Sequence, residues 1–165
     1  MLSLRSSRLS IYLNDHLAGS TVGVELARRA AASNGSTELG KALAELASEI
    51  EEDRKALVDI MERLGIGQDR VKLLASWAGE KAGRLKLNGQ LRGYSPLSRL
   101  EELEGLSLGV EGKLALWQTL QRTHGDEPKL RGVDFDDLIR RARSQRQRLE
   151  RRRRAAAEEA LASNA

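Results

Sequence analysis

Residues 39–64, LGKALAELASEIEEDRKALVDIMERL, carry the pattern from which the fold can be predicted. Apolar residues recur in this stretch every three or four positions, at Leu39, Leu43, Leu46, Ile50, Leu57, Ile60 and Leu64. This spacing is typical of an amphipathic helix that turns one face toward a core. Asp53 stands in the same row, at a position where the spacing requires an apolar side chain. The stretch therefore predicts a core-facing helix that carries a carboxylate on its inner face.

The composition of the whole chain indicates an all-α protein. The 165 residues are rich in alanine, leucine, glutamate and arginine, which favour helices, and they include only two prolines. No run of alternating β-branched residues is present from which a strand could form. The chain has no cysteine, which excludes disulfides, thiolate metal sites and a cysteine nucleophile. No apolar run reaches the ~18 residues of a membrane span, so we expect no membrane contact and a cytoplasmic location.

Capping and helix-breaking residues divide the chain into five predicted helices. They cover residues 7–33, 37–64, 69–91, 96–124 and 134–160. The connections between the first four are short, and short connections place consecutive helices antiparallel. We therefore predict an up-down-up-down antiparallel four-helix bundle with a fifth, C-terminal, arginine-rich helix. The alternative is an extended pair of helical hairpins that completes its core by dimerising.

The fifth predicted helix differs from the others in charge. Residues 140–154 contain nine arginines and one glutamate, a net charge of +8, whereas the whole chain carries only +4. Its apolar stripe, Phe135, Leu138, Ile139, Ala142 and Leu149, is narrow and ends at Leu149. We therefore divide the chain into a bundle domain, 1–127, and a partly docked basic helix, 128–165, whose end is exposed and frays.

The basic helix suggests a polyanionic or acidic partner. Its arginines are Arg140, Arg141, Arg143, Arg146, Arg148, Arg151, Arg152, Arg153 and Arg154. They could neutralise several phosphates of DNA or RNA, with strong dependence on salt, although no aromatic residue is present to stack on bases. An acidic protein surface is the second candidate partner, and a solvated helix is the alternative. Nucleic-acid binding predicts that a chain ending near Gln145 stays folded and loses binding.

Four ionisable residues lie on or beside the predicted inner faces near mid-length: His16, Asp53, Lys81 and Glu111. In an antiparallel bundle these positions come to similar heights. They could form a buried polar site, or an ion-pair network such as Asp53 with Lys81 and His16 with Glu111. An unpaired buried charge costs several kcal/mol, which favours pairing. A rotation of either helix would instead place Lys81 or Glu111 at the surface.

Glycines recur four residues apart within three of the predicted helices: Gly19 and Gly23, Gly79 and Gly83, and Gly105 and Gly109. A glycine inside a helix costs ~1 kcal/mol relative to alanine. We expect close approach of helices at these positions, either within the bundle or at a dimer face. Access for a ligand is the alternative.

The stretches YLNDHLAGSTVGVELARRA, ALAELASEIEEDRKALVDIMERLG and SRLEELEGLSLGVEGKLALWQTL resemble the ferritin-like superfamily, and in particular uncharacterised actinobacterial ferritin-like proteins. The resemblance covers residues 7–124 and implies a bundle that holds iron through glutamates and Glu-x-x-His pairs. This chain contains no Glu-x-x-His, and an inward Lys81 would repel a cation. We therefore expect that the fold is kept and the di-iron chemistry lost.

We accordingly expect a non-enzymatic structural or interaction protein without a cofactor, whose contact surface is the basic helix. A nucleic-acid-associated protein is the first alternative, and a homo-oligomer remains open. The second alternative is a metal-binding oxidoreductase or storage protein. It would hold iron or manganese through His16, Glu49, Asp53 and Glu111.

Overall fold

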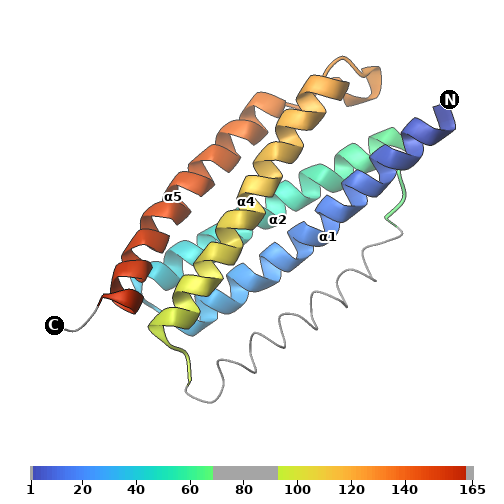
Figure 1. The fold of residues 1–165 in the computed structure, drawn as a ribbon. Helices are drawn as coiled ribbons and strands as arrows, with labels where there is room; N and C mark the ends of the chain where they lie inside the picture. The colour runs from blue at the N-terminus through green and yellow to red at the C-terminus, as the bar shows by residue number, and fades with distance from the viewer. Residues whose placement is uncertain (1, 69–92, 163–165) are drawn as a thin grey trace.

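The computed structural model describes residues 2–68 and 93–162, and this part of the chain forms an all-helical bundle (Figure 1). Its helices are α1 (Leu2–Asn34), α2 (Glu38–Leu64), α4 (Pro96–His124), the short 3₁₀ helix η1 (Pro128–Leu130) and α5 (Phe135–Leu161). The all-α prediction is confirmed. The predicted helix at 69–91 lies outside the described residues.

The helix ends lie close to the predicted positions because local capping groups fix them. Thr37 accepts a hydrogen bond from the backbone nitrogen of Gly40 at the start of α2, and Ser95 does the same for Ser98 in α4. The α2 helix ends at Gly65, whose φ of 70° is left-handed and suits glycine. The exception is α1, which begins at Leu2 rather than at residue 7.

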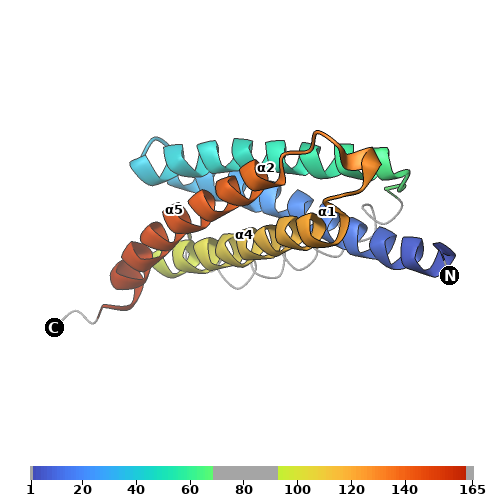
Figure 2. The ribbon, with the colours of Figure 1, turned by 90° about the horizontal axis from the view of Figure 1, so that it is seen from above.

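The described helices form two antiparallel hairpins, α1–α2 and α4–α5, that pack against each other (Figures 1 and 2). Helix α1 lies beside α4, and side chains of α5 reach α2. Helices α2 and α4 run in the same direction, so the end of α2 and the start of α4 lie at opposite ends of the bundle. Within the described part, the basic helix α5 is therefore one of the four long helices that surround the core.

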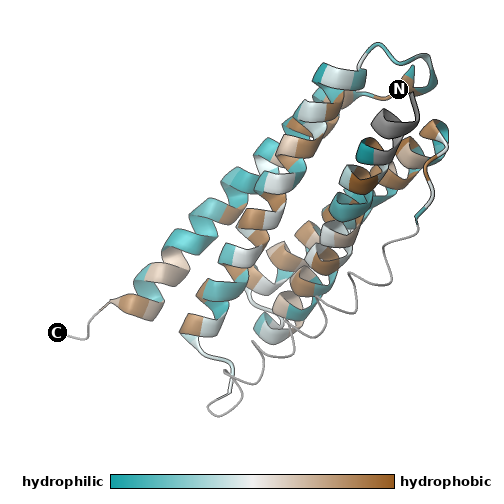
Figure 3. Cartoon of the chain, turned by 45° about the vertical axis from the view of Figure 1, so that its right-hand side comes forward, coloured by the Kyte–Doolittle hydropathy of each residue, from teal (hydrophilic) through white to brown (hydrophobic). Residues whose placement is uncertain are grey.

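The hydrophobic core consists of two clusters, one toward each end of the bundle. The first is built around Leu17, Leu57, Leu114 and Trp117, with Phe135 and Leu138 from α5. The second is built around Val24, Leu46, Ile50, Leu103 and Val110, with Leu149 and Ala156 from α5. Figure 3 shows apolar residues concentrated on the facing sides of the helices, and a largely hydrophilic α5.

The predicted apolar stripe of α5 is buried, but it extends further than expected. Leu149 is 2% exposed and Ala156 is 4% exposed, and α5 continues to Leu161. The prediction that the helix frays beyond Leu149 was wrong, because alanines and arginine stems can cover a core without large apolar residues. A salt bridge of 2.6 Å from Arg99 to Glu159 further ties the end of α5 to α4. A chain ending near Gln145 would lose Leu149 and Ala156 from the core, so we expect truncation there to destabilise the bundle.

Candidate functional site

Asp53 is the centre of a buried polar cluster at mid-height of the bundle. It is 1% exposed, and its Oδ2 accepts hydrogen bonds from Lys113 Nζ of α4 at 2.5 Å and from Gln145 Nε2 of α5 at 3.0 Å. Lys113 Nζ also donates to Gln145 Oε1. These three side chains from three helices form a closed hydrogen-bonded triangle. We call Asp53, Lys113, Gln145 and the adjacent Arg141 the polar layer.

Arg141 supplies the second positive charge of the polar layer. Its Nη2 lies 2.8 Å from Asp53 Oδ1 and 3.1 Å from Glu52 Oε2, and its side chain is 31% exposed. Asp53 Oδ1 nevertheless has no aligned hydrogen bond within the described residues. Arg141 therefore stabilises the carboxylate mainly through charge.

The polar layer separates the two core clusters. On α2, Asp53 lies between Ile50 of the second cluster and Leu57 of the first. On α4, Lys113 likewise lies between Val110 of the second cluster and Leu114 of the first. Burial lowers the pKa of Lys113, and the charge and hydrogen bond of Asp53 oppose that shift. Because both charges are removed from water, neither is stable there without the other.

The sequence predicted that Asp53 faces an amine, and the described structure places Lys113 there. Lys81, the predicted partner, lies outside the described residues. Lys113 and Gln145 were not predicted from the sequence, although both have apolar neighbours at helical spacing: Lys113 is three residues after Val110, and Gln145 is three residues after Ala142. Glu111, the residue predicted for this helix, directly follows the buried Val110 and lies at the edge of the buried stripe, with its side chain 56% exposed.

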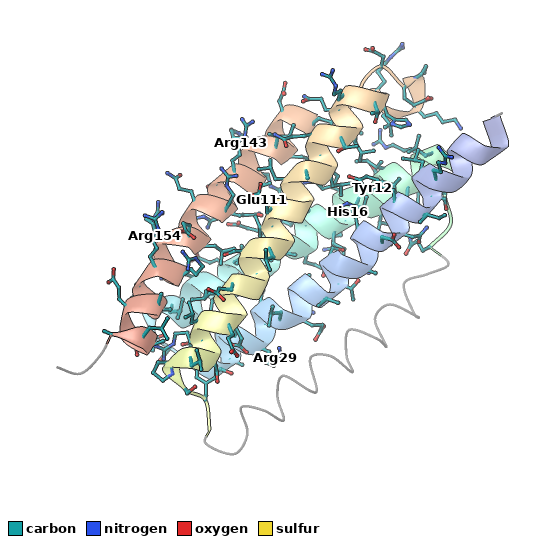
Figure 4. The ribbon with its side chains drawn as sticks, in the orientation of Figure 1. Tyr12, His16, Arg29, Glu111, Arg143 and Arg154 are labelled. Carbon is teal, nitrogen blue, oxygen red and sulfur yellow. The ribbon has the colours of Figure 1, made fainter. Side chains whose placement is uncertain are left out.

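Glu111 does not lie on the inner face as predicted. Its side chain is 56% exposed and forms a 3.0 Å salt bridge with Arg146 of α5. The predicted pairing of His16 with Glu111 was therefore wrong. His16 is partly buried on α1 and packs against the edge of the Tyr12 ring, with ring centroids 4.6 Å apart (Figure 4). Burial lowers the pKa of His16, and the charge of Asp15 opposes the shift.

The four candidate metal ligands do not form a common site. Glu49 pairs with Arg148, Glu111 pairs with Arg146, and Asp53 is enclosed by Lys113, Arg141 and Gln145. Across residues 2–68 and 93–162, no three histidine or acidic side chains are grouped to hold a metal ion. A divalent cation at Asp53 would have to displace one ammonium group and lie beside a guanidinium group. These four residues thus do not fit an iron or manganese site.

A cavity of about 430 Å³ lies beside the polar layer, between α1, α2 and α4. Gly19, Gly23, Gly105 and Gly109 all line it. Only Gly105 shows the predicted close approach, because an added Cβ there would lie 3.2 Å from Leu26 Cδ2. An added Cβ at Gly19 or Gly109 meets no described atom within 4 Å. Gly79 and Gly83 lie outside the described residues.

Most arginines of α5 pair with carboxylates. The ion pairs are Arg140–Asp137, Arg141–Glu52 and Asp53, Arg146–Glu111, Arg148–Glu49, Arg153–Glu104 and Glu150, and Arg154–Glu150. Hydrogen bonds from Arg153 and Arg154 lower the pKa of Glu150 to about 2. The pairs with Glu49, Glu52, Asp53, Glu104 and Glu111 attach α5 to α2 and α4, whereas the pairs with Asp137 and Glu150 lie within α5. Much of the positive charge of α5 is therefore neutralised within the bundle.

Three arginines of α5, namely Arg143, Arg151 and Arg152, have no carboxylate partner among the residues that the structure describes. Arg143 points away from the other helices in Figure 4. Arg143 and Arg151 line a shallow groove between α4 and α5, whose α4 side includes Leu108, a residue 76% exposed. We call this surface the α4–α5 face.

Comparison with family models, with curated proteins and with solved structures finds no match for this chain. Among the described helices, none is long and apolar enough to cross a membrane.

Proposed function

We propose that this protein is a ferritin-like helical bundle that acts as a structural and interaction protein, with its basic helix α5 as the contact surface. The observation that carries the proposal is the position of Lys113 Nζ, 2.5 Å from Asp53 Oδ2 at the centre of the bundle. An ammonium group there supplies the positive charge that a metal ion supplies in a di-iron bundle. The absence of cysteine fits a cytoplasmic location for such a protein.

The order of the helices supports the ferritin-like part of the proposal. Ferritin-like bundles have two antiparallel hairpins joined by one long crossover. Here α1–α2 and α4–α5 are antiparallel hairpins, and the end of α2 and the start of α4 lie at opposite ends of the bundle. We therefore propose that α5 forms one side of this bundle.

Metal analysis tests this part of the proposal. The full-length protein, expressed in medium supplemented with iron and manganese, is purified without chelator and measured by elemental analysis. We expect both metals at well below one ion per chain, because the carboxylate of Asp53 is already paired with the side chains of Lys113 and Arg141. Iron or manganese near one or two ions per chain would contradict the proposal and favour an oxidoreductase or storage protein.

The α4–α5 face is the part of α5 best suited to contact a partner. Its groove is lined by Arg143 and Arg151, which lack a carboxylate partner within the described residues, and by the exposed Leu108. Glu104, Glu111 and Glu150 also line the groove, and they would repel a continuous phosphate backbone. An acidic protein surface with an apolar contact suits this mixture better than nucleic acid does.

Charge reversal tests the contact surface. The variant Arg143→Glu/Arg151→Glu/Arg152→Glu changes no ion pair among the residues that the structure describes, and poly-L-glutamate serves as the acidic probe. We expect the triple variant to bind poly-L-glutamate at low salt at least tenfold more weakly than the original chain does. The charge-matched control, Lys55→Glu/Arg122→Glu/Lys129→Glu, places the same charges outside α5 and is expected to change binding much less. Equal losses in both variants would show only a nonspecific charge effect.

Nucleic-acid binding is the second candidate function, and the excess of arginine on α5 is the observation that favours it. Backbone-driven binding predicts a mobility shift of duplex DNA that weakens steeply with salt. The same triple variant is expected to lose this shift, whereas the control triple variant keeps it. DNA binding that exceeds poly-L-glutamate binding at equal ionic strength would favour this function over an acidic protein partner.

A further inference from the structure

The α4–α5 face carries the most exposed large apolar side chain among the described residues, that of Leu108. Its exposed fraction is 76%, and the next highest value is 66% at Leu161, the last residue of α5. Leu108 lies in the middle of α4 rather than at a helix end, and it lines the groove between α4 and α5. Covering this side chain with an apolar group of a partner would favour binding.

The groove of the α4–α5 face has one acidic wall and one mainly basic wall. Among the described residues that line it, α4 contributes Glu104 and Glu111 and no basic residue. Helix α5 contributes Glu150 and five arginines, namely Arg143, Arg146, Arg151, Arg153 and Arg154. The lining therefore carries a net charge of +2, from five arginines and three glutamates. An occupant with carboxylates toward α5 and none toward α4 would be complementary to it.

Two ion pairs fix the alignment of the two walls. Glu111 Oε2 lies 3.0 Å from Arg146 Nη1. Seven residues earlier on α4, Glu104 Oε1 lies 3.7 Å from Arg153 Nη1, and Arg153 is seven residues after Arg146 on α5. Leu108 stands between the two glutamates on α4, so it lies between the two ion pairs along the axis of the bundle.

The arginines that are available to a partner lie on either side of Leu108 along this axis. Arg143 is three residues before Arg146 and lies beyond one ion pair, whereas Arg151 is two residues before Arg153 and lies close to the other. Neither Arg143 nor Arg151 has a carboxylate partner within the described part of the chain. Eight residues separate them, which corresponds to about 12 Å along a helix. The face thus presents two guanidinium groups with an apolar side chain at a level between them.

Both walls of the groove are helices, which limits the conformation that an occupant can adopt. The backbone groups in the middle of α4 and α5 are bonded within each helix, so the walls offer no edge to which an extended peptide could add as a strand. No aromatic residue is among the described residues that line the groove, whereas polyproline segments dock in aromatic-lined grooves. A helix needs neither feature, because its backbone bonds are internal and its side chains pack between those of two neighbouring helices.

We infer that the α4–α5 face binds an amphipathic acidic helix of a partner protein. Two carboxylates about two helical turns apart pair with Arg143 and Arg151, and a large apolar side chain between them covers Leu108. The side of the partner helix that faces α4 carries no acid, because Glu104 and Glu111 would repel it. This inference rests on the proposed function and specifies the partner of the same surface.

Two helical peptides of identical composition test the inference. The matching peptide carries two glutamates seven positions apart and a leucine four positions after the first, on an otherwise uncharged helix rich in alanine and glutamine. In the rearranged peptide the leucine is moved to the opposite side of the helix. Each is labelled with a fluorophore and titrated into the full-length protein at low salt, with binding followed by fluorescence anisotropy. We expect the matching peptide to bind at least tenfold more tightly. Equal binding of the two peptides, or no binding of the matching peptide, would overturn the inference.

Leu108→Ala locates the apolar contact. This variant should weaken the matching peptide at least fivefold and leave the binding of poly-L-glutamate unchanged. Its matched control is Leu97→Ala, which shortens a leucine of α4 that is 48% exposed and lies outside the groove, and which should bind both probes as the original chain does. Circular dichroism checks that both variants remain folded. Equal losses of peptide binding in the two variants, or no loss in Leu108→Ala, would refute this location.

Single substitutions of arginine test the charged contacts. Arg143→Gln and Arg151→Gln should each weaken the matching peptide by about threefold, as expected for an exposed ion pair. The control is Arg152→Gln, which removes the same charge from α5 at a position outside the groove and should change the binding less. Equal effects of all three substitutions would contradict the assignment of these two arginines.

Poly-L-glutamate distinguishes failure of this inference from failure of the proposed function. If the original chain binds poly-L-glutamate but binds the two peptides equally, the basic contact surface stands and the helical partner is wrong. Absence of binding to poly-L-glutamate and to both peptides would overturn both proposals.

Discussion

Replacing Lys113 by methionine removes one partner of the buried pair and leaves Asp53 in the core. The lysine side chain is 10% exposed and that of Asp53 is 1% exposed, so water cannot replace the lost ammonium. Removing one member of a buried ion pair costs about 3–5 kcal/mol. Arg141 and Gln145 still contact the carboxylate, so we expect the lower end, about 3 kcal/mol. For a chain of this size that corresponds to a fall in Tm of about 6–12 °C.

The assay is urea unfolding followed by circular dichroism, with Lys55→Met as the control, because Lys55 is exposed on α2. The control should change the free energy of unfolding by less than about 0.5 kcal/mol. A double variant, Asp53→Leu/Lys113→Met, removes both charges and should recover at least about 2 kcal/mol relative to Lys113→Met. A cost below about 1 kcal/mol for the single variant, or additive costs in the double variant, would refute the reasoning.

Three further predictions concern other parts of the bundle. Because burial lowers the pKa of His16, the unfolded chain binds its proton more readily, so stability should decline as the pH falls below 6.5 toward the lowered value. In a His124→Gln background, His16→Gln should flatten that decline in unfolding measured between pH 5 and pH 7. Leu149→Ala should cost about 2–4 kcal/mol in urea unfolding if α5 belongs to the core, and a cost near zero would show that it does not. Gly19→Ala should stabilise α1 by up to about 1 kcal/mol, because alanine favours a helix more than glycine does. Gly40→Ala should instead destabilise α2, because the new Cβ would lie 2.1 Å from the carbonyl oxygen of Gly35. Equal shifts in Tm for the two variants would contradict these expectations.

The sequence was sufficient to predict the helices, because the residues that end them act locally. Thr37 and Ser95 cap helices through hydrogen bonds to residues three positions later, and Gly65 ends α2 in a conformation that favours glycine. The interior position of Asp53 could also be predicted, since it interrupts a single row of apolar residues. Each of these inferences needs only neighbours within about one helical turn.

The partners of Asp53 could not be predicted in the same way. Lys113 and Gln145 are 60 and 92 residues away in sequence, so their contact depends on the rotation of α4 and α5 about their own axes. Both Glu111 and Lys113 lie beside the stripe of α4 that contains the buried Val110, Leu114 and Trp117, so helical spacing alone does not say which of them turns inward. The structure distinguishes them, because the side chain of Lys113 is 10% exposed and that of Glu111 is 56% exposed.

The extent of ion pairing on α5 was also beyond prediction from sequence. A run of arginines has the same composition whether it faces solvent or a row of acids. Glu49 and Glu52 of α2 become partners of Arg148 and Arg141 only because α2 and α5 are neighbours in the bundle. These pairs depend on the position of α5 beside α2, which cannot be read from the run of arginines itself.

The polar layer has a consequence for the axial alignment of the helices. Leucine-rich helices can slide past each other by one turn, about 5.4 Å, and still exchange one apolar contact for another. A one-turn slip of α4 would bring Val110 or Trp117 to the level of Asp53 and leave the carboxylate without its ammonium. Misaligned packings of the same core are therefore penalised by a buried charge. We expect the pair of Asp53 and Lys113 to fix the axial register of the helices, because apolar packing alone would be compatible with several alignments.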